Sequence, residues 1–352
     1  MINKLLAALP EKLDGMLILS EVNRRYFTGF PSSDGILLVT RGGSVFLTDS
    51  RYIEAAKDTV KCCEVEELKN TKIQLPELCK KLGCRVLGVE GDRMSVNELK
   101  AYRKMLKPVT LTSNKTDEVI NRLRAVKTED EVLKIKKAQA IAEDAFRHIL
   151  GFIKEGVTEK EIALQLDYFM LKNGAEALSF ETIAISGANT SKPHGVPTDK
   201  KVKRGDFITM DYGAVFDGYH SDMTRTVAVG EISTKQEQVY NTVLKAQLSS
   251  LSVLRAGLKC SDGDKAARDV IAEAGYGEFF RHSTGHSVGV EIHEVPNMSP
   301  KSKGVLKEGN IVTVEPGIYI PGEFGVRIED MALIRHNNCE NLTKIQKELL
   351  II

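Results

Sequence analysis

The chain has 352 residues, of which 42% are hydrophobic, and its 49 basic and 48 acidic side chains leave a formal net charge of +1. This length is enough for two domains, because single domains usually have about 100–200 residues. The balanced charge, without a concentrated basic block, excludes strong electrostatic attraction to nucleic acid or to an anionic membrane. No apolar run approaches the roughly 18 residues of a membrane span, and the apolar start is too short for a secretory signal, so we expect a cytoplasmic protein.

The first part of the chain, residues 1–118, alternates short apolar runs with helical patterns, which predicts an α/β domain. The runs expected to form strands are 17–19, 36–39, 45–47, 86–89 and 109–111, and the helical patterns include 75–82 and 96–105. No phosphate-binding glycine loop occurs among them. A polar stretch at 112–117 leads into the second predicted domain, residues 119–352.

Three helix starts can be read in the second domain from capping boxes, in which a Thr is followed three residues later by a Glu. These are Thr128 with Glu131, Thr158 with Glu161, and Thr234 with Glu237. Between the helices lie β-patterned segments that form hairpins. Helices interleaved with antiparallel hairpins predict an α+β fold and not a doubly wound parallel sheet.

Four carboxylates lie inside apolar, β-patterned runs, where an unpaired charge is costly, and one histidine lies in a glycine-rich stretch. These residues are Asp211, Asp222, Glu315, Glu329 and His286. Four ionised carboxylates in one site would repel one another, and two divalent cations would balance their charge. Oxygen ligands with a single imidazole suit Mn, Co, Fe or Zn. Paired ions of this kind activate water for attack on acyl or phosphoryl groups, so hydrolysis is the expected reaction class.

The first two carboxylates can be placed by hairpin geometry. The runs 207–216 and 219–229 flank Asp217-Gly218, a two-residue turn signal. In that register Asp222 lies opposite Gly213, and Asp211 is two residues further along the same face, within side-chain reach. By itself the pair is equally compatible with two unrelated carboxylates that face solvent.

A second predicted hairpin repeats the arrangement. The runs 311–320 and 325–334 read as strands joined through Pro321-Gly322, each with a Glu at its middle. Two hairpins with a carboxylate on each arm, and a histidine between them in sequence, are hard to explain as a solvated surface.

Several motifs then carry a family resemblance: 210–213 (MDYG), 218–226 (GYHSDMTRT), 282–294 (HSTGHSVGVEIHE), 313–319 (TVEPGIY) and 326–330 (VRIED). They resemble the motif series of the pita-bread metallopeptidases, and most closely the Xaa-Pro branch, prolidase and aminopeptidase P. The stretches 23–30 and 47–52 are similar to the creatinase-type N-terminal domain of that branch.

The resemblance implies a creatinase-like domain at 1–118 and a pita-bread catalytic domain with a curved antiparallel sheet at 119–352. It also implies two divalent metal ions per chain, with Mn or Co favoured and Zn or Fe as alternatives. Peptides with proline in second position are the implied substrates, and a homodimer the implied assembly. Asp211, Asp222, His286, Glu315 and Glu329 occupy all five metal-ligand positions of the family.

Further site residues are His194, His282, His293 and Glu315, which follow from the same resemblance, and Arg327, which shares a predicted strand and a face with Glu329. His194 would contact substrate, His282 would neighbour the active site, and His293 would bond the reacting carbonyl. Glu315 would carry the proton from water to the leaving nitrogen, and Arg327 would orient the carboxylates. Without the resemblance, His194 reads as an exposed loop residue. The alternative for Arg327 is an ordinary salt bridge.

One position departs from the prolidase pattern. Prolidase-type enzymes commonly have Arg after His-Glu-x-Pro, where it helps to receive the free carboxylate of a dipeptide, but this chain has Asn297. Lys301 or Lys303 replaces that cation only in part. We therefore expect an aminopeptidase P that cleaves the bond between an N-terminal residue and proline, with Xaa-Pro dipeptidase as the alternative. A non-catalytic pita-bread binding protein and a creatinase-like amidinohydrolase are more remote alternatives.

Overall fold

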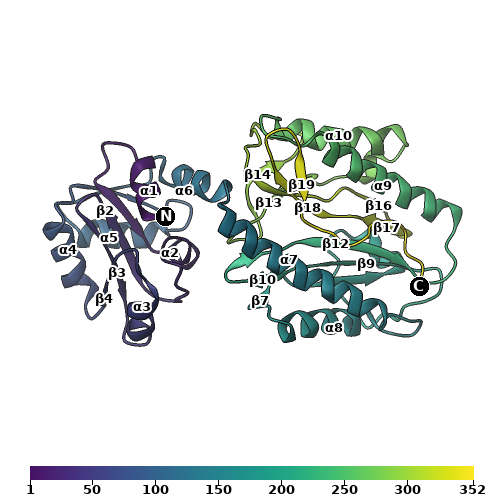
Figure 1. Ribbon diagram of the computed structural model, residues 1–352, viewed down its shortest axis with the longest axis horizontal. Coiled ribbons are helices and arrows are strands. Elements are labelled where there is room, and N and C mark those ends of the chain that lie inside the picture. The colour runs from purple at the N-terminus through teal and green to yellow at the C-terminus, as the bar shows by residue number, and fades with distance from the viewer. The chain divides into compact units, whose positions relative to one another are not determined.

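The computed structural model describes all residues 1–352 and divides them into two compact units, Met1–Leu123 and Arg124–Ile352 (Figure 1). Both units combine helices with sheets that contain antiparallel pairs, so the predicted α+β class is confirmed. None of the helices combines the length and the apolar character that crossing a membrane demands.

The first unit is built on one six-stranded mixed sheet with the order β4-β3-β2-β1-β5-β6. Its strands are β1 (Gly15–Ile18), β2 (Ile36–Thr40), β3 (Gly43–Thr48), β4 (Glu64–Glu67), β5 (Val86–Val89) and β6 (Thr110–Thr112). Its helices are α1 (Ile2–Ala8), α2 (Glu21–Thr28), α3 (Ile53–Thr59), α4 (Thr71–Lys81) and α5 (Val96–Met105), and α6 (Thr116–Ala125) crosses the boundary. The five predicted strands are all present. The additional strand, β4, contains three glutamates and lies at the sheet edge, where such residues are tolerated.

The second unit has four long helices, α7 (Glu129–Leu150), α8 (Glu159–Lys172), α9 (Thr234–Val253) and α10 (Cys260–Glu273). Helices α7 and α8 cover one side of the sheets and α9 and α10 the other (Figure 1). The capping boxes predicted at Thr128 and Thr158 are confirmed. The box predicted at Thr234 is wrong by one residue, because the Ser233 hydroxyl accepts the backbone N–H of Gln236 and Thr234 is the first helical residue.

The strands of the second unit form several small sheets in place of one continuous sheet. The sheet orders are β11-β10-β7, β12-β9-β8, β14-β13-β15-β18-β19 and β16-β17. The first six strands are β7 (Ala177–Leu178), β8 (Ile183–Ser186), β9 (Phe207–Tyr212), β10 (Ala214–Phe216), β11 (Tyr219–His220) and β12 (Met223–Ala228). The remaining strands are β13 (Gly285–Ser287), β14 (Glu294–Met298), β15 (Ile311–Val314), β16 (Gly317–Ile320), β17 (Phe324–Arg327), β18 (Asp330–Ile334) and β19 (Cys339–Asn341). Short 3₁₀ helices lie at η1 (Gly187–Ser191) and η2 (Gly277–Phe279).

The first predicted hairpin forms in the expected register. Asp217 and Gly218 have φ of 47° and 77°, as a tight hairpin turn of this hand requires. Val215 pairs with His220, and Met223 pairs with Tyr212, so the same register places Asp222 opposite Gly213. The arms are interrupted, however, between β9 and β10 and between β11 and β12. Asp222 therefore lies at a break where the chain passes from one sheet to the next.

The second hairpin shows the same interruption, which corrects the prediction of two continuous strands. Val314 pairs with Asp330 before the break and Gly317 pairs with Arg327 after it. The register is unchanged across the break, so Glu315 lies opposite Glu329, and neither residue belongs to a strand. One physical reason is Pro316, which has no N–H to donate to a ladder.

Candidate metal centre

A cavity of about 580 Å³ in the second unit is lined by all the predicted metal ligands and catalytic residues. Its lining includes the five predicted metal ligands, Asp211, Asp222, His286, Glu315 and Glu329. It also includes His194, His282, His293, Asn297 and Arg327. These side chains come from segments up to 135 residues apart, from His194 to Glu329, and three of the carboxylates, Asp222, Glu315 and Glu329, lie at the breaks in the two hairpins.

The most compact group consists of Asp222, His286 and Glu329, whose potential ligand atoms all lie within 4.8 Å of one another. The Nε2 atom of His286 is 3.5 Å from Asp222 Oδ2 and 3.5 Å from Glu315 Oε1. The Nδ1 atom of His286 is 3.1 Å from the Ser287 carbonyl oxygen, which only accepts, so Nδ1 carries the proton. The Nε2 lone pair is then directed at the carboxylates, as a metal-binding imidazole requires.

Two carboxylate oxygens in this cavity are buried without a hydrogen-bond partner, Asp211 Oδ1 and Glu329 Oε1. The second oxygen of each group is engaged, since Asp211 Oδ2 accepts from Arg327 Nη2 at 2.6 Å and Glu329 Oε2 from Thr224 Oγ1 at 2.7 Å. Buried oxygens of ionised carboxylates are costly when nothing compensates them. Divalent cations would compensate these oxygens, so the residues present fit the metal that their chemistry implies. Asp211 lies outside the compact group, and the two-ion arrangement stays a prediction.

The electrostatics of the carboxylate group reflect burial and mutual repulsion. Burial raises the pKa of Asp222 and of Glu329 well above their ordinary values, and the neighbouring carboxylates raise both further. Burial also raises the pKa of Glu315 to about 8, with Asp211 adding to the effect and Arg327 opposing it. Burial, together with the nearby His293, lowers the pKa of His286 to about 4. The imidazole is thus neutral at physiological pH, and a nearby cation would favour the ionised forms of Asp222, Glu315 and Glu329.

A chain of hydrogen bonds runs along one wall of the cavity from Arg327. Its Nη1 atom donates to the Tyr319 hydroxyl at 2.9 Å, and that hydroxyl lies 3.0 Å from His282 Nε2. His282 Nδ1 faces the Ser283 carbonyl at 2.8 Å and must donate, so Nε2 accepts from Tyr319. Burial and the charge of Arg327 lower the pKa of His282 to about 4, which agrees with this neutral form. These hydrogen bonds hold the Arg327 guanidinium in place, and the Nη2 atom of Arg327 donates to Asp211.

Sequence reasoning missed Tyr319 and Thr224, the residues that hold Arg327 and Glu329 in place. Strand alternation carried a signal for both. Tyr319 has the same parity as Glu315, and Thr224 the same parity as Asp222, so each shares a face with a predicted ligand.

The remaining predicted residues lie around the compact group. The His293 ring packs edge-on against the His286 ring with centroids 4.4 Å apart. His194 follows η1 in a loop, and the carbonyl of the preceding Pro193 accepts from Arg327 Nη1 at 3.1 Å. Asn297, on β14, is exposed and lines the cavity, whereas neither Lys301 nor Lys303 does. Arg327 is the one lysine or arginine in the lining.

Comparison with known proteins matches the two units to two family models. Residues 133–336 match metallopeptidase family M24, and residues 1–126 match the creatinase/prolidase N-terminal domain. An Xaa-Pro dipeptidase of Pyrococcus furiosus is 40% identical over 339 residues, which cover 96% of this chain and 95% of that protein.

Solved structures agree across the whole chain. The Xaa-Pro dipeptidase from Bacillus anthracis aligns with a TM-score of 0.95 and 42% identity, covering 100% of this chain and 99% of that one. The X-Pro aminopeptidase from Thermotoga maritima aligns with a TM-score of 0.94 and 36% identity, with the same coverage. The fold is therefore the pita-bread fold with a creatinase-type N-terminal domain, and the protein is a hydrolase. Enzymes of this family act on peptide substrates and use divalent metal ions. The chain belongs to metallopeptidase family M24, in its branch of Xaa-Pro dipeptidases and aminopeptidases.

Proposed function

We propose that the protein is an Xaa-Pro aminopeptidase, which releases an N-terminal residue from proline in peptides longer than two residues at least as well as in dipeptides. The observation that carries this proposal is the charge of the cavity wall. Arg327 is the one lysine or arginine in the lining, and its guanidinium is engaged by Asp211, Tyr319 and the Pro193 carbonyl. A dipeptide brings a free carboxylate next to its proline ring, and Asn297 offers it no charge.

The alternative, an Xaa-Pro dipeptidase, is favoured by the printed names of two similar proteins, those of Pyrococcus furiosus and Bacillus anthracis. The name of the Thermotoga maritima structure favours the aminopeptidase. Similarity at about the same level to both kinds of enzyme leaves the cavity residues as the basis for choosing between them.

Within this proposal the side chains act in distinct ways. His293 donates a hydrogen bond to the scissile carbonyl oxygen as negative charge develops on it. Glu315, held by Thr313 Oγ1 at 3.2 Å, accepts a proton from the attacking water and returns it to the leaving proline nitrogen. His194 contacts the substrate from its loop, and His282 fixes Tyr319. Arg327 orients Asp211.

Asp211, Asp222, His286, Glu315 and Glu329 would hold two divalent ions, of which Mn or Co is proposed as the physiological metal. When bound, such ions supply Lewis acidity and lower the pKa of water. We also propose that residues 119–352 carry the chemistry, that residues 1–118 form the accessory domain, and that the enzyme works as a homodimer in the cytoplasm on short peptides.

The proposal is tested by the ratio of two specificity constants. Metal-reconstituted enzyme is assayed with a dipeptide Xaa-Pro and with the tripeptide Xaa-Pro-Xaa that has the same first residue. We expect kcat/KM for the tripeptide to equal or exceed that for the dipeptide. A dipeptide preference of about tenfold or more, which corresponds to about 1.4 kcal/mol, would contradict the aminopeptidase assignment and support the dipeptidase.

A further inference from the structure

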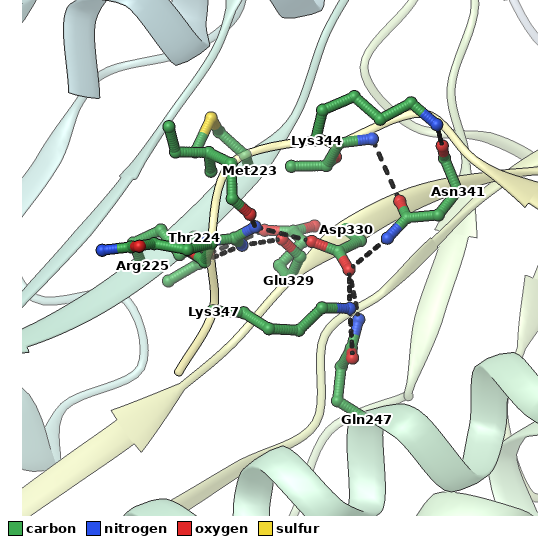
Figure 2. Close-up of polar contacts among 12 residues, drawn as sticks. Met223, Thr224, Arg225, Gln247, Glu329, Asp330, Asn341, Lys344 and Lys347 are labelled. Atoms are coloured by element: carbon green, nitrogen blue, oxygen red, sulfur yellow. Dashed lines mark hydrogen bonds and ion pairs between the residues drawn. The ribbon is translucent and has the colours of Figure 1, made fainter. Parts of the chain in front are cut away.

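A buried polar cluster lies next to Thr224 and Glu329 (Figure 2). We call it the Asp330 cluster, and it consists of Arg225, Gln247, Asp330, Asn341 and Lys347. Arg225 on β12 and Asp330, the first residue of β18, belong to the cluster. The residues that precede them, Thr224 and Glu329, are hydrogen-bonded to each other, and Glu329 lines the cavity.

Arg225 donates hydrogen bonds to the main chain of both segments, the one that carries Thr224 and the one that carries Glu329. Its Nη1 atom donates to the carbonyl oxygen of Glu329 at 2.6 Å and to that of Thr224 at 2.9 Å. Its Nη2 atom donates to Asp330 Oδ1 at 2.8 Å. The main chain adds one direct link, from the N–H of Glu329 to the carbonyl of Thr224 at 3.1 Å. One guanidinium thus sets the position of Glu329 relative to Thr224.

The C-terminal segment, residues 343–352, is bound to the same guanidinium. Arg225 Nε donates to the carbonyl of Gln346 at 2.9 Å, and Nη2 donates to that of Ile345 at 2.9 Å. The Lys347 ammonium donates to Asp330 Oδ2, and to Gln247 Oε1 at 3.0 Å. Further along, the carbonyl of Leu350 accepts from Ala228 on β12 at 2.9 Å. The segment is therefore attached twice to the strand that carries Thr224.

A buried ion pair such as that of Arg225 and Asp330 adds little net stability to a protein core. The Arg225 and Asp330 side chains are 1% and 0% exposed, and the desolvation of such a pair offsets most of its Coulombic gain. A guanidinium has a fixed planar geometry, however. Its hydrogen bonds to Thr224, Glu329 and Asp330 therefore restrict the relative positions of these residues more narrowly than apolar packing would. The position so defined matters at the cavity, because Thr224 is the one hydrogen-bond donor to the Glu329 carboxylate.

We propose that Arg225 and Lys347 are positioning residues for the metal centre: with the C-terminal segment they hold Thr224 against Glu329, so that this carboxylate is presented to metal in one orientation. The inference rests on the proposed metal-binding role of Glu329. Neither residue lines the cavity, so their effect is on the affinity for metal.

The test measures the Kd of Mn²⁺ by titration calorimetry on metal-stripped full-length protein, together with the melting temperature with and without Mn²⁺. Arg225→Lys keeps the positive charge but loses the planar guanidinium with its several donors. Lys347→Met keeps an unbranched side chain of similar length but loses the charge. We expect both to raise the Kd about 10–100-fold, the usual effect of losing a group that orients a metal ligand. The rise in melting temperature on adding Mn²⁺ should shrink accordingly. Lys347→Arg, which restores a cation, should remain close to wild type.

A matched control comes from the first unit, where Arg24 is also buried and donates to the carbonyls of Ser32, at 2.6 Å, and Leu19. Arg24→Lys should lower the melting temperature without changing the Kd. If Arg225→Lys does not fold, Lys347→Met alone decides. An unchanged Kd in the folded variants, with only a lower melting temperature, would overturn the inference and leave the metal centre standing. Wild-type protein that binds no Mn²⁺ would contradict the metal centre itself, and this inference with it.

Discussion

Asn297 lines the cavity, and the proposed function depends on its lack of charge. Asn297→Arg should place a cation there, and a charge-assisted contact with the free carboxylate of a dipeptide should shift the ratio of kcat/KM toward Xaa-Pro by about 1–3 kcal/mol. Both substrates should be measured under identical metal loading. Asn297→Gln, which adds length without charge, is the control and should leave the ratio unchanged. An unchanged ratio in the Arg variant would show that the dipeptide carboxylate binds elsewhere.

His293 lies against His286 but is assigned to the substrate and not to the metal. His293→Ala should therefore keep the metal content of wild type and lower kcat by about 10²–10³, the scale for loss of one donor to a developing oxyanion. Elemental analysis of the purified variant, alongside its kinetics, separates the two roles. Loss of metal from the variant would make His293 a ligand or a support of one.

The site residues differ in how visible they are in the sequence. Asp211, Glu315 and Glu329 stand out because a carboxylate in an apolar run is expensive and demands an explanation. Tyr319 and Thr224 do not stand out, because tyrosine and threonine are ordinary strand residues. Their importance comes from partners that only the fold brings close, such as the pairing of Thr224 with Glu329 across 105 positions.

The breaks in the hairpins are the element-scale feature that builds the cavity, and Gly213 shows why one of them needs glycine. A Cβ atom at this position would lie 1.9 Å from the carbonyl oxygen of Ser221. Gly213→Ala should therefore push apart the segments that carry Asp211 and Asp222, lower the free energy of unfolding by about 1–3 kcal/mol or more, and weaken metal binding.

Urea unfolding of the metal-stripped protein measures the effect of Gly213→Ala. The matched control is Gly151→Ala, since Gly151 has φ of −77° and the nearest atom to an added Cβ is 3.6 Å away. That substitution should stay within about 0.5 kcal/mol of wild type. Equal stability of the two variants would contradict the close approach at Gly213.

Elements were predictable where local chemistry decides them. The Asp217-Gly218 turn and the boxes at Thr128 and Thr158 depend on residues two or three positions apart, and the structure has each of them. The interruption at Glu329 was not predictable, because the β pattern runs through this position and sheet switching depends on distant strands. For the interruption at Glu315 the sequence did carry a signal, Pro316, which the prediction of a continuous strand overlooked. The edge strand β4 was not predicted either, because its polar sequence has no β pattern and it forms a strand only by pairing with β3.

For the molecule as a whole, the buried carboxylates predict an unusual pH dependence of stability without metal. Glu315 has its folded pKa raised to about 8 from an ordinary 4.5, so the folded state binds this proton more tightly than the unfolded chain. Its contribution to stability is therefore present at low pH and is lost as the pH rises through about 8. His282 and His286, with folded pKa values of about 4, are neutral in both states above pH 6.5 and oppose the trend only below it.

The melting temperature of metal-stripped protein should thus fall between about pH 6.5 and 8.5, while that of Mn²⁺-loaded protein should not, because the cation holds the carboxylates ionised. Thermal unfolding across this range, in chelator and in Mn²⁺, measures the difference. Glu315→Gln should make the profile of the stripped protein less steep, while Asp222 and Glu329, whose pKa values are also raised, keep part of the slope. A stripped protein whose stability rises with pH in this window would mean that Glu315 is not the group that sets it.

The central claim is that Asp211, Asp222, His286, Glu315 and Glu329 form one metal centre. Its most direct test is the number of divalent ions bound per chain, measured by elemental analysis after reconstitution with Mn²⁺ and removal of excess metal. Two ions in wild type, at most one tightly bound ion in Asp222→Asn, and loss of Xaa-Pro hydrolysis on chelation are the predicted results. Folded wild-type protein that retains no ion after reconstitution, or an Asp222→Asn variant with full metal content, would contradict the claim.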